Sequence, residues 1–291
     1  MPVDSVLVQR QRPLIWGCAI VPVLIVATFL PFFPGGHDPL AVPLSAMAWA
    51  LGRVGLLLVP VGALWLWVST SRESRPAPPA WLVRITLGAC ILIAMVTVLV
   101  GFASSGSQVL AAVTAAFMGL LTIRLRRRMR STEAGGSKPS VAAAAILVVA
   151  PLVVLAAQTM LVDRVTRQAR HRVIANGAPL IAEIERYRER RGAYPESLFS
   201  IWGDYKPSTV GVERYHYERS GETYNVIFRE PSLGFGTRRF VVYNPRDTQR
   251  VTVHEQDRLL LDEAALDADN AGYTVIETLP QPHWKVFLFL S

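Results

Sequence analysis

One short stretch near the end of the chain has the residue types and the spacing of a calcium loop. Asp267, Asp269 and Asn270 fall at positions one, three and four of a twelve-residue loop that has glycine at position six. Carboxylate and amide oxygens are the ligands that Ca²⁺ prefers in such loops. Position five is alanine and position twelve is Thr278, so an ordinary Asp/Asn/Gly turn is the alternative interpretation. Calcium is the only metal or cofactor for which the sequence offers candidate ligands.

Other residues that do chemistry elsewhere give weaker patterns. The five histidines never show His-x-His or His-x-x-x-His spacing, and the two cysteines both lie in apolar stretches. No nucleophile elbow or phosphate-binding loop occurs. Glu185 and Glu189 lie one helical turn apart as an acid–base pair would, although a solvated helix face is the stronger interpretation. We therefore assign no catalytic residue, and a membrane enzyme with unidentified catalytic residues remains one alternative.

Arg53 is an ionisable residue inside a long apolar stretch. A charged residue within a membrane span is a candidate functional residue by default, which makes a transport or channel component that uses Arg53 a further alternative. The competing interpretation starts from residues 54–70, which are nearly long enough to span alone, so that Arg53 snorkels at the outer interface. Trp65 and Trp67 then mark the opposite interface.

The composition divides the chain into an apolar basic part and a polar neutral part. Hydrophobic residues make up 51% and charged residues 18%, and the mean hydropathy is +0.32, which argues against disorder and against a single soluble globule. Up to Val162 there are twelve Lys and Arg against four Asp and Glu, and from Asp163 onward there are eighteen of each. The basic excess thus belongs to the apolar part, where Lys and Arg set membrane orientation.

Five apolar segments approach or exceed the ~20 residues that cross the hydrocarbon layer of a bilayer. They are residues 14–33, 42–68, 81–102, 109–123 and 141–162. A cleaved signal peptide is the alternative for the first, but no clean small-x-small site follows it directly. The sequence therefore predicts a membrane region with four spans over residues 1–140 and a fifth span over 141–162.

Basic residues occur in every second connection between these segments. They are Arg10 and Arg12, then Arg72, Arg75 and Arg84, then Arg124, Arg126, Arg127, Arg128, Arg130 and Lys138. The positive-inside rule then predicts a multi-pass protein of the cell (inner) membrane, with its amino end in the cytoplasm and residues 163–291 outside. The arginines from 124 to 130 suit lipid head groups, whereas nucleic-acid binding is not expected because no aromatic interleaving or reader module accompanies them.

Residues 163–291 predict an extracytoplasmic α+β domain, an amphipathic helix followed by an antiparallel sheet. The helical pattern continues from the last span to residue 176, breaks at residues 177–179 and restarts at Pro179. Strand patterns follow over residues 212–219, 223–230, 239–243, 250–254, 272–278 and 284–290, with a short helix or strand edge at 259–267. The fold class is therefore a five-span helical bundle followed by an α+β domain.

The end of the predicted helix carries a residue pattern that predicts a helix stop at its glycine, a rigid turn and a tyrosine packed on the sheet. Six residues match the series Tyr-x-x-x-x-Gly-x-Tyr-Pro-x-Ser-Leu in order: Tyr187, Gly192, Tyr194, Pro195, Ser197 and Leu198. This segment resembles the G-type pseudopilins of type II secretion systems. The resemblance covers residues 141–230 and implies a pilin-like head, in a family where some members carry calcium in a late loop. Pseudopilins have one span, at the extreme amino end, so the resemblance implies here a pilin-like domain fused to a membrane bundle.

These observations favour a non-enzymatic integral membrane protein over the two alternatives. The expected partners are the lipid bilayer and other envelope or secretion proteins. The pilin-like domain is expected to serve interaction or envelope assembly, since the residues of the polar part form no catalytic motif and its charge is balanced.

Overall fold

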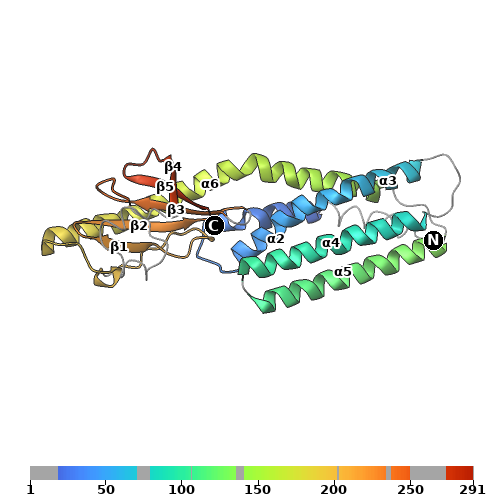
Figure 1. Cartoon of the computed structure of the whole chain (residues 1–291), viewed down its shortest axis with the longest axis horizontal. Coiled ribbons are helices and arrows are strands. Elements are labelled where there is room, and N and C mark those ends of the chain that lie inside the picture. Colours follow the sequence, from blue (N-terminus) through green and yellow to red (C-terminus); the bar gives the residue numbers. More distant parts are fainter. Residues whose placement is uncertain are drawn as a thin grey trace, which may run out of the picture. The chain divides into compact units, whose positions relative to one another are not determined.

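The computed structural model describes residues 19–70, 79–105, 107–135, 141–201, 203–233, 237–249 and 273–290 (Figure 1). The chain divides into two compact units. The helical unit comprises Met1–Leu30 and Leu40–Val162, and the polar unit comprises Pro31–Pro39 and Asp163–Ser291. The predicted strand at 250–254 and the element at 259–267 lie outside the described residues.

The helical unit is built from apolar helices. Its elements in chain order are a helix within Ala19–Phe32 that ends in the 3-10 turn η1 (Leu30–Phe32), then α2 (Ala41–Val54), η2 (Gly55–Leu57), α3 (Leu58–Thr70), α4 (Ala80–Ser105), α5 (Gln108–Gly135) and the start of α6 (Val141–Arg191). Within the described ranges, three stretches are long and apolar enough to cross a membrane: Ala41–Thr70, Ala80–Ser105 and Val141–Arg191. Ala19–Phe32 and Gln108–Arg124 are shorter apolar helices. The prediction of apolar, membrane-compatible helices is thus confirmed for three of the five segments.

Small residues let these helices approach one another closely. Helices α4 and α5 lie side by side, and α2 packs on α4 (Figure 1). A Cβ atom added to Gly62 would lie 2.8 Å from Val148 of α6, and one added to Gly101 would lie 2.7 Å from Met47 of α2. Trp65 is buried, and its indole Nε1 donates to Thr86 Oγ1 at 2.8 Å. Trp65 therefore holds α3 against α4, a role that the prediction of an interfacial tryptophan did not include.

The polar unit contains the predicted antiparallel sheet. Its strands are β1 (His216–Ser220), β2 (Thr223–Glu230), β3 (Thr237–Tyr243), β4 (Tyr273–Thr278) and β5 (Trp284–Leu290), in the spatial order β1-β2-β3-β5-β4. The β1–β2 hairpin turns at Gly221, whose φ of +56° is readily adopted by glycine. This confirms the hairpin that the Ser-Gly-Glu sequence predicts.

Helix α6 corrects one expectation. The predicted break at residues 177–179 does not occur, since α6 runs unbroken from Val141 to Arg191. Packing explains its continuity: Val173, Leu180 and Ile184 are completely buried in the core of the polar unit. Gly177 gives room for the ring of Tyr215, whose hydroxyl donates to the Val173 carbonyl at 2.5 Å. This tertiary packing outweighs the local cost of a glycine and a proline inside a helix.

The core of the polar unit joins α6 to the sheet. Tyr224, Val226 and Phe228 of β2 are completely buried and belong to the same cluster as the α6 residues. The other face of β2 is not a polar surface, because Ile227 is buried in a second cluster with Val242 and Phe287. The central strands are therefore covered on both faces.

A short segment from the early part of the chain also belongs to the polar unit. Pro34 forms an antiparallel bridge with Thr209, flanked by hydrogen bonds from Gly35 N to Ser208 O and from Val210 N to Phe33 O. The guanidinium of Arg172 donates to the Phe32 carbonyl at 3.1 Å. Residues 31–33 were predicted as the end of the first span and residues 34–39 as the loop that follows it, so the sequence did not reveal that they complete the polar unit.

Candidate functional site

The predicted calcium ligands cannot be located. Asp267, Asp269 and Asn270 lie outside the described residues, so the calcium loop stays a prediction. Among the described side chains, no group of three or more His, Cys, Asp or Glu is arranged to hold a metal ion.

Arg53 lies on the surface of the helical unit. Its side chain is exposed, and its guanidinium carbon lies 4.5 Å from the ring centroid of Trp49, a cation–π geometry. The arginine of the transport hypothesis therefore stacks on a neighbouring aromatic ring instead of pointing into the interior of its unit.

The two candidate acid–base glutamates have different surroundings and do not form a pair. Glu189 is exposed, whereas Glu185 accepts a hydrogen bond from the Tyr224 hydroxyl at 2.9 Å. The Tyr194 hydroxyl also lies 3.4 Å from the Glu185 carboxylate. Glu185 therefore does not have the free carboxylate of a general base, and it is not an ordinary solvated residue. Its carboxylate accepts hydrogen bonds from tyrosine hydroxyls that are packed on the sheet.

The tyrosines around Glu185 form an aromatic cluster on the sheet. The ring centroids of Tyr194 and Tyr224 are 4.8 Å apart, and those of Tyr243 and Trp284 are 5.3 Å apart. Burial raises the pKa of Tyr215 and Tyr217 well above the ordinary value of 10, and burial together with the Glu185 hydrogen bond does the same for the pKa of Tyr224. These hydroxyls keep their protons at neutral pH and act as hydrogen-bond donors.

The pseudopilin-like segment has clear structural roles in the polar unit. Gly192 ends α6 with a φ of +75°, and its N–H donates to Arg188 O at 2.7 Å. Tyr194 is buried against the sheet, and the Tyr217 hydroxyl donates to Pro195 O at 2.7 Å. The pattern therefore stops the helix and fastens the following turn to the sheet.

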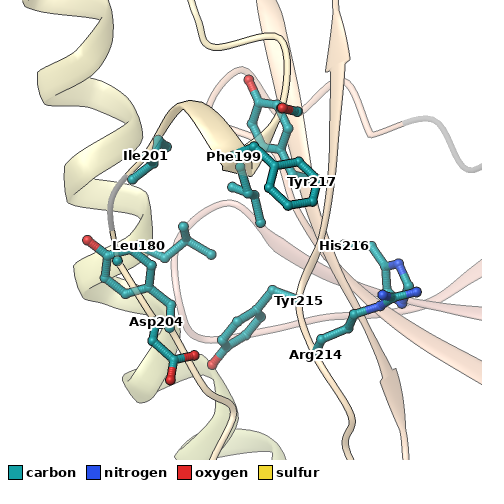
Figure 2. Close-up of a pocket in the computed structure, with 12 residues that line it drawn as sticks. Leu180, Phe199, Ile201, Asp204, Arg214, Tyr215, His216 and Tyr217 are labelled. Carbon is teal, nitrogen blue, oxygen red and sulfur yellow. The ribbon is translucent and has the colours of Figure 1, made fainter.

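A groove of about 630 Å³ lies beside this turn (Figure 2). Figure 2 shows Leu180 from α6 on one side and Phe199 and Ile201 from the loop after α6. Tyr215, just before β1, and Tyr217, within β1, complete the lining shown there. Phe199 belongs to η3 (Leu198–Ser200), and its side chain is 98% exposed. Phe199 thus presents an apolar ring to solvent at the edge of the groove.

The chemistry of the groove suits binding. The hydroxyls of Tyr215 and Tyr217 are both engaged with backbone carbonyls, so the groove presents the apolar faces of their rings. Arg214, His216 and Asp204 add polar groups to its lining. A largely apolar groove with a few polar groups can hold an apolar or aromatic side chain of another polypeptide.

A buried ionic cluster fixes α6 to the sheet away from this groove. Arg170 Nε lies 2.6 Å from Glu230 Oε1, and its Nη1 lies 2.7 Å from Glu277 Oε2. Burial by itself favours a lower pKa for Arg170. The hydrogen bonds and charges of Glu230, and to a smaller extent those of Glu277, outweigh burial, so the pKa of Arg170 lies above its ordinary value. The sequence analysis did not predict this cluster. One signal was available: Arg170 lies three residues before Val173, on the apolar face of an amphipathic helix, where an arginine needs a buried partner.

A second buried polar group lies in the helical unit. Gln158 of α6 is 2% exposed, and its Nε2 donates to Ala48 O at 3.3 Å and to Thr28 Oγ1 at 3.4 Å. Ser45 Oγ donates to the Thr28 carbonyl. These bonds join α6, α2 and the helix within Ala19–Phe32. Hydrogen bonds between polar side chains help to hold helices together in a membrane, where no water competes for them.

Comparison with known proteins gives no relative. No protein-family model, no curated protein and no solved structure matches this chain. The resemblance to pseudopilins therefore depends on the residue pattern at 187–198 and stays a prediction.

Proposed function

We propose that this chain is a five-span protein of the cell (inner) membrane whose polar unit faces the exterior and serves as an interaction module for other envelope or secretion proteins. The single observation that carries the proposal is the attachment of residues 31–39 to residues 208–211 by backbone hydrogen bonds. Segments that pair in this way lie on the same side of a membrane.

This attachment limits the number of crossings between the two paired segments. A chain that leaves one side of a membrane and returns to it crosses an even number of times. Among the described residues between 40 and 163, three helical stretches have the length and hydropathy of spans, and three is an odd number. The apolar start of α5, Gln108–Arg124, supplies a fourth crossing. It packs along α4, as an antiparallel hairpin of two spans does.

The first apolar segment adds the fifth crossing if it is retained in the mature protein. Thr28 is completely buried and bonds to Gln158 inside the helical unit, while Phe32 is buried and accepts from Arg172 in the polar unit. Cleavage after this segment would remove contacts in both units. This supports an uncleaved first span, with an amino end on the cytoplasmic side as the arginine distribution predicts.

Reporter fusions at four positions test the proposed topology. An alkaline phosphatase, which is active only outside the cytoplasm, should be active after Ser105 and Ser291 and inactive after Thr70 and Gly135. A cytosolic fluorescent reporter should give the opposite result at each position. Phosphatase activity after Gly135 would show that α5 does not cross the membrane. An inactive phosphatase after Ser291 would overturn the proposal.

The interaction role is supported by the groove beside Phe199. A photo-crosslinking amino acid at position 199 should give discrete adducts in intact cells, since this ring is 98% exposed next to an apolar groove. Ile276 of β4, which is 44% exposed, is the matched control position. Equal adduct patterns at both positions would count against the groove as the interaction surface.

A further inference from the structure

Three arginines form a basic collar on α5, directly at the end of its apolar part. Arg124, Arg126 and Arg127 are all exposed. Some exposed arginines of the polar unit do pair with carboxylates, as Arg186 and Arg190 do with Glu183. No carboxylate within the described part of the chain pairs with the three arginines of the collar.

The apolar part of α5 and its arginines bring no neutralising charge of their own. From Gln108 to Thr132 the helix contains no acidic residue. Successive helical residues are rotated by about 100°, so Arg124 and Arg127 lie about 60° apart on one side of α5, and the three arginines of the collar together span an arc of about 160°. Such an arc of charge at the end of an apolar helix segment fits the layer of phosphate groups at a membrane surface.

We propose that the basic collar binds the phosphate groups of anionic phospholipids in the leaflet that the carboxyl-terminal part of α5 reaches. This inference rests on the proposed function, because α5 must be a span. Gln108–Arg124 has 17 residues, or about 25 Å of helix, slightly less than the ~30 Å hydrocarbon layer. Arg124 therefore falls at the depth of the phosphate layer. The guanidinium forks of the collar match phosphate oxygens bidentately, and the negative leaflet surface supplies complementary charge.

The test measures lipid binding by the full-length protein in detergent. Binding of phosphatidylglycerol and of zwitterionic phosphatidylcholine is followed by native mass spectrometry. The variant carries Arg124→Gln, Arg126→Gln and Arg127→Gln. The matched control, Arg186→Gln, Arg190→Gln and Arg191→Gln, removes the same charge from the end of α6. We expect the affinity of the collar variant for phosphatidylglycerol to fall by a factor of about ten or more. The control variant should bind phosphatidylglycerol as tightly as the wild type does.

The wild-type protein provides a second measurement that requires no variant. Its preference for phosphatidylglycerol should fall as salt rises from about 0.05 M to about 0.5 M, because added ions screen exposed charges. Free glycerol phosphate should compete only weakly, since it lacks the membrane anchoring of a lipid. Tighter binding of an oligonucleotide than of phosphatidylglycerol would overturn the lipid assignment in favour of nucleic acid.

The two proposals fail in distinguishable ways. An active phosphatase after Ser291 in the collar variant, together with unchanged phosphatidylglycerol binding, overturns the lipid site and leaves the topology intact. An inactive phosphatase after Ser291 in the wild-type chain overturns both.

Discussion

Single residues in the polar unit show charge that is neutralised inside the fold. Arg170 and Glu230 are almost fully buried and form two hydrogen bonds with each other, while Glu277 closes the cluster from a more exposed position. Removing charges from water is costly, so such a pair holds α6 on the sheet only as long as both partners are present.

Glu230→Gln should therefore destabilise the polar unit by about 3 kcal/mol, since it leaves a buried guanidinium with one carboxylate fewer. The unfolding midpoint in denaturant, followed by near-ultraviolet circular dichroism of the aromatic cluster, measures this. Glu277→Gln is the matched control: its carboxylate is 45% exposed, and the loss should stay below about 1 kcal/mol. Equal effects of the two substitutions would show that burial of Glu230 is not what matters.

The raised tyrosine pKa values predict weaker folding at alkaline pH. Below pH 10 the buried tyrosines are protonated in both the folded and the unfolded state, and their contribution to stability is complete. Above about pH 10 the unfolded chain releases these protons while buried Tyr224 keeps its own, so stability falls as pH rises. Tyr224→Phe should lower stability at pH 7 by about 1 kcal/mol through the lost bond to Glu185 and flatten the alkaline decline. An equally steep decline in the variant would contradict this assignment.

Sequence reasoning identified some of these residues and missed others for a physical reason. The Gly192, Tyr194 and Pro195 pattern predicts a helix stop and a packed tyrosine because its geometry is local, and both are present. Arg170 and Glu230 are 60 residues apart, and only the folded chain brings them together. The calcium candidates lie outside the described residues, and the calcium loop stays a prediction.

Among the elements, α6 is the one whose sequence and structure disagree most. Glycine and proline at 177 and 179 predict an interruption, yet the helix continues because its buried face packs against the sheet. The antiparallel strands were predictable, since period-two patterns and a glycine turn are local signals, whereas the continuity of α6 depends on tertiary contacts.

Pro179→Ala distinguishes the two descriptions of α6. Pro179 is exposed, so no packing is lost, and alanine restores a backbone N–H inside the continuous helix. We expect the free energy of unfolding of the polar unit to rise by about 1–3 kcal/mol. If a new helix began at Pro179, the same substitution would be neutral or slightly destabilising, because proline is favoured at a first helical position.

Gly52→Ala tests the packing of α2 against α6. The added Cβ would lie 2.6 Å from the Gln158 amide nitrogen and 2.8 Å from Val154, so the thermal midpoint of the detergent-solubilised protein should drop by an amount equivalent to about 1–3 kcal/mol. Gly88→Ala in α4 is the control, because a Cβ there meets nothing within 4 Å. A midpoint for Gly52→Ala at or above that of Gly88→Ala would contradict the close approach.

At the scale of the whole molecule, two segments far apart in sequence complete one unit. The predicted boundary at residue 163 coincides with a unit boundary, but residues 31–39 also belong to the polar unit. Local patterns in these nine residues give little sign of this, because most of their hydrogen bonds to residues 208–211 are made by the backbone and depend on a segment far away in the sequence.

A disulfide across this attachment tests the central claim most directly. Pro34 and Thr209 are a non-hydrogen-bonded antiparallel pair, whose Cα separation of about 4.5 Å suits a disulfide. In a background of Cys18→Ala and Cys90→Ala, the chain with Pro34→Cys and Thr209→Cys should form an intramolecular disulfide in intact cells, seen as a mobility shift that reductant reverses, while neither single-cysteine chain shifts. If both cysteines stay reduced in intact cells although each is labelled by an impermeant thiol reagent once the other segment is released by denaturation, the two segments are not paired and the account is wrong.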